Sequence, residues 1–247
     1  MTNNGEFGER RRSKHRFFLM VAWFALAVIF VGFLKTFVLP SVRGSFHAPL
    51  VVYLHGAFLL LWSLLFAAQS MLVQAGQVKR HRTLGAISLV LVPGVVFSTM
   101  AIGVFALRRD LAAGGGEIAT SSLVGTFSSP LMFALLVMVA IAYRRKPEFH
   151  KRLMLLALIA ILWPAFFRLR HYFPNVPRPD FWFAFVLPNM VVLIAMLRDK
   201  LSLGRVHPVY WTVGIAVVLE NFAELMLFDS AGWRVLAHWL AGFFVAA

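Results

Sequence analysis

The chain has 247 residues, of which 60% are hydrophobic and only 14% charged, with a mean hydropathy of +0.79. A soluble core of this size would not bury so much apolar surface, so the composition indicates a protein that contacts lipid. The net charge of +14 comes from basic residues placed between long apolar runs, which argues against a nucleic-acid partner. With no cysteine, disulfides, iron–sulfur clusters and covalently attached haem are excluded.

In chain order, a basic segment, 1–16, precedes seven apolar stretches that can each cross about 30 Å of hydrocarbon as an α-helix. The first stretch is too long for a signal-peptide core and has no small-residue cleavage site after it, which predicts an uncleaved anchor. The stretches are 17–39, 48–73, 84–107, 123–143, 153–173, 181–197 and 208–228. We predict an all-α integral membrane bundle with a seven-helix transmembrane domain over 17–228.

The charge distribution predicts the orientation of this bundle. Most of the 24 Lys and Arg residues fall on the side of the N-terminus, which the positive-inside rule places in the cytoplasm of a bacterial cell with an inner membrane. The glycine-rich segment 112–116 is then a flexible outer loop. The basic residues on the other side are Lys35, Arg43, Arg108, Arg109, Arg168, Arg170, Arg178 and Arg234.

The C-terminal segment, 229–247, has an apolar stripe at helical spacing, with Arg234 and His238 on the opposite face. Such a segment forms an amphipathic helix in the membrane interface or an eighth span. We favour the interfacial helix.

Ionisable residues inside the spans are the main functional signal, because a charge in a bilayer is costly to bury and usually needs a partner. His55 lies about 12 Å inward of His47, and Glu220 about 13 Å inward of Asp229, at the rise of an α-helix. The two residues are therefore at similar depth in the outer half of the membrane. Arg168 belongs to the same half, because its span has a short apolar stretch before this residue.

Glu220 and Glu224 are at positions i and i+4 and project from one helix face beside Asn221. Their natural partners are Arg168 and His55. An outward-facing pocket of this chemistry would bind a ligand, metal or proton. The alternative is an Arg168–Glu220 ion pair that only fixes helix packing. The candidate pocket consists of His55, Arg168, His171, Glu220, Asn221 and Glu224.

Two further histidines stand where the third and fifth spans begin. His81 lies in the segment KRHRTLG and His150 in EFHKRLM, each followed by basic residues and then by an apolar helix. One interpretation is a pair of basic interfacial anchors. The other is that two imidazoles face each other across neighbouring helices and ligate a haem b, together with His55 as a further cofactor-binding candidate.

Several of these motifs together resemble a family of predicted bacterial multi-pass membrane proteins of unknown function. The resemblance covers a four-helix core, about 47–171, and implies that His55, His81, His150 and Arg168 are signature positions. More remotely, histidines near both faces of such a core are similar to transmembrane b-type cytochromes. The motifs are His55, Gln69, His81-Arg82-x-Leu84-Gly85, His150-x-Arg152-x-Met154 and Pro164-Ala165-x-x-Arg168.

Two functional hypotheses of different classes follow. The first is a membrane redox protein that binds a haem or a metal and works with a membrane redox partner or quinone. The second is a non-enzymatic transporter, sensor or assembly factor that uses the outward-facing pocket. The sequence has no catalytic Ser-His-Asp elbow, P-loop or dinucleotide-binding fingerprint, which argues against the common soluble enzyme classes.

Overall fold

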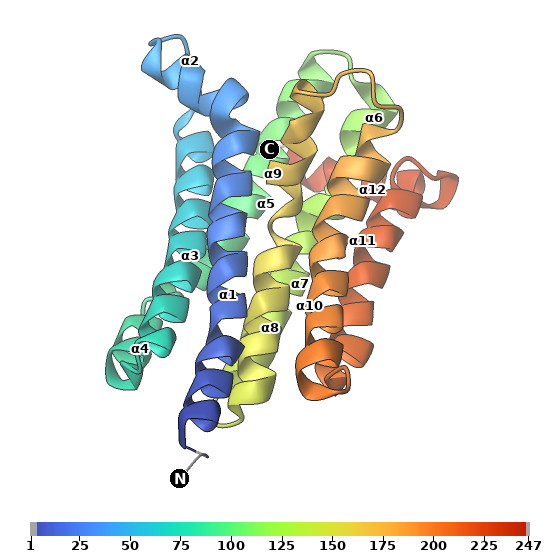
Figure 1. Ribbon diagram of the computed structural model, residues 1–247. Coiled ribbons are helices and arrows are strands. Elements are labelled where there is room, and N and C mark those ends of the chain that lie inside the picture. Colours follow the sequence, from blue (N-terminus) through green and yellow to red (C-terminus); the bar gives the residue numbers. More distant parts are fainter. Residues whose placement is uncertain (1–3, 246–247) are drawn as a thin grey trace.

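A computed structural model describes residues 4–245, with side chains from residue 16 onward (Figure 1). The side chains of the basic segment 1–16 therefore lie, except for Arg16, outside the described residues. Helices are the only regular secondary structure within residues 4–245. The first half of the chain forms α1 (Asn4–Phe33), η1 (Leu34–Val38), α2 (Leu39–Val42), α3 (Leu50–Gln74), α4 (Val78–Gly85), α5 (Ser88–Ala112), α6 (Gly116–Ser121) and α7 (Leu123–Ala142).

The second half of the chain contains three spans that are built from more than one helical segment. It forms α8 (Pro147–Ala160), α9 (Trp163–Phe167), η2 (Arg168–His171), η3 (Asp180–Val186), α10 (Leu187–Leu203), η4 (Tyr210–Gly214), α11 (Ile215–Leu227) and α12 (Ala231–Val245).

The prediction of seven membrane-spanning helices is confirmed, and the chain is a multi-pass membrane protein. The spans are Arg16–Val42, Leu50–Gln74, Ser88–Ala112, Gly116–Ala142, Pro147–His171, Asp180–Leu203 and Tyr210–Leu227. The third span begins later than predicted, because α4 is a separate short helix before it. The predicted outer loop at 112–116 is a tight turn in which Gly114 and Gly116 take positive φ angles, the backbone conformation that favours glycine.

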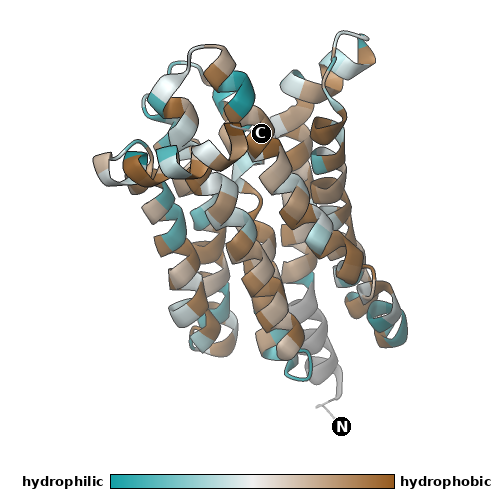
Figure 2. Cartoon of the chain, turned by 180° about the vertical axis from the view of Figure 1, so that it is seen from behind, coloured by the Kyte–Doolittle hydropathy of each residue, from teal (hydrophilic) through white to brown (hydrophobic). Residues whose placement is uncertain are grey.

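The spans run side by side between two faces of the bundle (Figure 1). The N-terminus, α4 and the start of α8 lie at one face, which we call the N-terminal face. The short helices α2, α6 and α9 lie toward the other, which we call the distal face. Figure 2 shows hydrophobic residues along the middle of the spans and hydrophilic residues gathered mainly at the two ends, as expected for a bundle that contacts lipid around its sides.

The fifth span is the centre of the bundle. Of the 18-residue apolar stretch of this span, 61% is buried inside the protein, the largest share among the seven spans. Every side chain from Leu155 to Ala160 is buried, and α8 packs mainly against α7 and also against α10. This placement matters for function, because α8 carries His150 and Arg152 at its N-terminal end.

The C-terminal helix α12 lies across the distal face, at the ends of the spans (Figures 1 and 2). It packs on α6, on α5 and on the start of α7, where Leu107, Ala119, Leu123 and Ala241 form a small core. Its 15 residues reach about 22 Å as a helix, too short for a typical span. This arrangement fits the interfacial helix that we favoured over an eighth span.

Candidate functional site

The two predicted histidines at the N-terminal face lie next to each other. His81 comes from the short helix α4 and His150 from the first turns of α8, and their ring centroids are 6.4 Å apart with the ring planes at 82°. A metal that binds a ring nitrogen at about 2 Å lies about 3 Å from the ring centroid. One metal between two imidazoles would therefore place their centroids about 6 Å apart.

Neighbouring groups orient this histidine pair. The Nδ1 atom of His150 lies 2.8 Å from the carbonyl oxygen of Ala140, so a hydrogen on Nδ1 would donate to that carbonyl and leave Nε2 with its lone pair. His81 Nδ1 and Gln69 Oε1 are both buried, and neither has a hydrogen-bond partner in the described part of the chain. Gly85, one turn after His81, lies against Gln69, because a Cβ at this glycine would be 3.3 Å from Gln69 Nε2.

Burial and the neighbouring groups favour the neutral form of His81. Burial lowers the pKa of His81 below its usual 6.5, and the nearby His150 and the charge of Arg82 lower it further. Neutral imidazole is the form that binds a metal.

The histidine pair is not part of a larger cluster of metal ligands. Among the residues with described positions, no three His, Asp or Glu side chains gather in a way that could hold a metal ion. A metal site made by protein ligands alone normally needs three or four of them. Two imidazoles instead suit a cofactor such as haem, which supplies four ligands of its own.

A buried charge network adjoins the pair, and the sequence analysis did not identify it as a site. The side chain of Arg152 is fully buried, with Nε 2.7 Å from Asp199 Oδ2 and Nη1 2.7 Å from Glu148 Oε2. Arg198 Nη1 is 3.0 Å from the other Asp199 oxygen. Asp199 was a detectable signal, since it is an acid within a turn of the apolar stretch 181–197, but its partner could not be inferred from spacing.

The carboxylates predicted for the outward-facing pocket point instead toward α7. Glu224 Oε1 accepts hydrogen bonds from Ser128 and Ser129, at 2.7 Å from the Ser129 hydroxyl. Glu220 is hydrogen-bonded to Glu224 through its side chain. Asn221 Nδ2 donates to Asn189 Oδ1 on α10 at 3.2 Å.

Arg168 contacts different elements, α9 and α1. The span breaks between α8 and α9, and Arg168 Nη1 donates to the carbonyl oxygen of Pro164 at 3.0 Å. Its Cζ atom lies 4.0 Å from the centroid of the Phe33 ring on α1. His55 on α3 is an electrostatic neighbour of Arg168, and its Nδ1 is buried without a partner among the described residues. His171 is exposed at the end of the same span.

The predicted Arg168–Glu220 ion pair is therefore wrong. Within residues 16–245, Arg168 has no carboxylate within 4.0 Å, and it shares no hydrogen bond with Glu220, Asn221 or Glu224. The physical reason is that the two side chains lie against different elements. Glu220 is hydrogen-bonded to Glu224, and its Oε1 atom is buried without a partner among the described residues, whereas a carbonyl oxygen and an aromatic ring contact the guanidinium of Arg168. The span α11 correspondingly packs on α7 and η3 in this half of the bundle.

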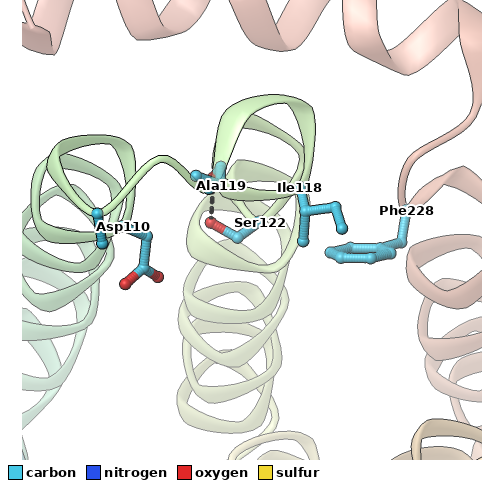
Figure 3. A pocket seen from close by; sticks show the side chains of 7 residues that line it. Asp110, Ile118, Ala119, Ser122 and Phe228 are labelled. Atoms are coloured by element: carbon cyan, nitrogen blue, oxygen red, sulfur yellow. Dashed lines mark hydrogen bonds between the residues drawn. The ribbon is translucent and has the colours of Figure 1, made fainter.

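Two hollows in the surface lie away from the predicted residues. One, of about 330 Å³, lies at the distal face between Asp110, Ile118 and Phe228, where Ser122 Oγ donates to the carbonyl of Ala119 at 2.7 Å (Figure 3). The other, of about 540 Å³, has an apolar lining from α3 and α5 that includes Phe58 and Phe97. Neither is lined by a residue predicted for function.

Comparisons with protein-family models, with curated proteins and with solved structures find no match for this chain.

Proposed function

We propose that this membrane protein binds haem b through His81 and His150 and takes part in membrane electron transfer. The observation that carries the proposal is the meeting of these two imidazoles, from different helices, at a centroid distance of 6.4 Å. We also propose that the chain is a member of the family of predicted bacterial membrane proteins that its motifs resemble. We further propose that it lies in a bacterial inner membrane with its N-terminus in the cytoplasm.

The residues around the pair suit such a cofactor. The Ala140 carbonyl would fix the tautomer and ring orientation of His150, as the outer partners of metal-bound histidines do. His81 Nδ1 and Gln69 Oε1 are buried without a hydrogen-bond partner among the described residues, which favours a further polar or metal-bearing group here, because buried polar groups in folded proteins are rarely left without a partner. When bound, haem supplies a one-electron redox couple. Its electron partner would be a membrane quinone or another redox protein.

The test is an absorption spectrum of the protein purified from cells supplied with haem precursor. We expect sharp bands in the reduced-minus-oxidised spectrum, and their loss in both His81→Ala and His150→Ala. The matched control is His207→Ala, which removes a third histidine at the N-terminal face that packs against the ring of Phe149 at 4.7 Å. Retention of the bands in both ligand variants, or their absence from the native protein, would contradict the proposal.

The transporter hypothesis has lost its main argument. It depended on one outward-facing pocket that joined Arg168 to the carboxylates of span seven, and these groups contact different elements. The redox proposal is therefore the better supported of the two.

A further inference from the structure

Three basic residues gather at the distal ends of the first and fifth spans. They are Lys35 of η1 and Arg168 and Arg170 of η2. Lys35 Nζ donates to the carbonyl oxygen of His171 at 3.1 Å, which ties the two spans together. His171 has Arg170, Arg168 and Lys35 as its electrostatic neighbours. All three cations belong to the minority that does not follow the charge asymmetry of the sequence.

Among the described side chains, no acid neutralises this basic cluster of Lys35, Arg168 and Arg170. Over the described side chains, none of the three has a carboxylate oxygen within 4.0 Å. At the N-terminal face, by contrast, Arg152 contacts both Asp199 and Glu148.

Aromatic rings hold the three cations in place without cancelling their charge. Lys35 Nζ is 4.2 Å from the centroid of the Tyr172 ring, Arg168 Cζ is 4.0 Å from that of Phe33 and Arg170 Cζ is 3.8 Å from that of Phe167. Within the described residues, each guanidinium makes one hydrogen bond, from Nη1 to a backbone carbonyl, although it has five N–H donors in all. The cluster is therefore preorganised and has donors to spare.

The position of the cluster makes an uncompensated charge costly. Arg168 and Arg170 are half-buried within the last turns of a membrane span. Like charges that lie close together at the edge of a low-dielectric medium repel one another, so a bound anion would remove an electrostatic penalty as well as gain hydrogen bonds. His55 adds a buried Nδ1 beside Arg168 that has no hydrogen-bond partner in the described part of the chain.

We propose that Lys35, Arg168 and Arg170 form an anion-binding site at the distal face, suited to a phosphate group. Guanidinium groups bind phosphate oxygens through paired N–H donors, and a lysine ammonium adds a point charge. The ends of membrane spans lie at the depth of lipid headgroups, so the phosphate can belong to an anionic phospholipid or to a small soluble anion. The site is separate from the histidine pair and does not depend on haem.

The first experiment measures the thermal stability of the purified native protein under three conditions. One sample in detergent receives inorganic phosphate, with chloride at equal ionic strength as its reference. Two further samples are in nanodiscs of phosphatidylglycerol or of phosphatidylcholine. Stabilisation by inorganic phosphate identifies a soluble anion as the ligand, whereas stabilisation by phosphatidylglycerol alone identifies a lipid headgroup. If neither raises the Tm, the proposal is wrong.

The variants Arg168→Gln and Arg170→Gln should each lower the affinity for the anion that stabilises the native protein by about tenfold or more, because each removes a charged contact to that anion. The matched control is Arg43→Gln, which removes the same charge from an exposed position outside the cluster, at the end of α2. An equal loss of affinity in the control would show that the effect comes from overall charge and would overturn the site.

A second measurement does not require the cations to be removed. Because the chain has no cysteine, His171→Cys gives a unique thiol at an exposed position beside the cluster. An anionic thiosulfonate reagent should label it several-fold faster than a cationic reagent of similar size, and high salt should reduce the difference. Equal rates, or faster labelling by the cationic reagent, would contradict a net positive site.

Discussion

At the scale of single residues, the buried and half-buried cations of this protein differ in what neutralises them. Arg152 is fully buried and contacts two carboxylates, so its charge is balanced inside the protein. Arg168 contacts a ring and a carbonyl, neither of which carries a net charge. The first arrangement is a structural ion pair, and the second leaves a charge for a ligand to balance.

This difference predicts that Asp199→Asn destabilises the bundle by about 3 kcal/mol or more, because it leaves the buried Arg152 with only Glu148 as an acidic partner. The control is Asp180→Asn, which breaks an exposed pair with Arg178 and should cost about 1 kcal/mol or less. Denaturant unfolding in detergent measures both values. Equal effects of the two variants would mean that the Arg152 pair contributes no more than a surface contact.

At the scale of helices, close backbone approach fixes how the first span meets the fifth. Gly32 on α1 lies so near α9 that a Cβ would be 2.3 Å from the carbonyl oxygen of Ala165. Backbone cannot move aside as a flexible side chain does, so no larger residue fits here without separating the two helices. This contact sets the position of Phe33, the next residue, on which the guanidinium of Arg168 stacks.

We therefore expect Gly32→Ala to destabilise the protein by about 1–3 kcal/mol. Gly56→Ala is the matched control, because a Cβ at Gly56, also inside a span, meets no atom within 4 Å. It should be neutral or slightly stabilising, since alanine has the higher helix propensity. The measurement is the Tm of each variant relative to that of the native protein. A lower Tm for Gly56→Ala alone would contradict the packing argument.

The sequence predicts the spans well, because length and hydropathy are properties of each segment alone. It places Arg168 and Glu220 in the same half of the membrane, yet depth does not reveal which helices are neighbours or which way each helix is rotated. Ser128 and Ser129, the actual partners of Glu224, carry no signal that distinguishes them from other small polar residues in a span. The hypothesis that His81 and His150 face each other agrees with their positions, because both begin helices at the same face and so share a depth.

At the scale of the whole molecule, the orientation in the membrane decides which compartment each site faces. With seven spans, the N-terminal face and the distal face lie on opposite sides of the bilayer, and α12 rests on the distal face (Figure 1). In the proposed orientation, with the N-terminus in the cytoplasm, the proposed haem site would lie near the cytoplasm and the anion site near the outside. The charge asymmetry of the sequence supports this orientation, because most Lys and Arg residues lie on the side of the N-terminus. The three cations of the distal cluster are exceptions to this asymmetry, and the proposed anion site accounts for them.

A pair of reporter fusions tests this orientation. An alkaline phosphatase fused after Ala247 should be active, because it would be exported, and the same enzyme fused after Gly76, in the turn between α3 and α4, should be inactive. A green fluorescent protein at the same two positions should give the reverse pattern, which controls for failed expression.

Phosphatase activity after Gly76 with none after Ala247 would mean that the bundle has the opposite orientation. The basic cluster would then meet the anionic lipids of the cytoplasmic leaflet. Equal activity at both positions would mean that Gly76 and Ala247 lie on the same side of the membrane. Five spans separate these two points, and an odd number of spans places them on opposite sides. Such a result would therefore mean either that α12 is an additional span or that one of the seven helices does not cross the membrane.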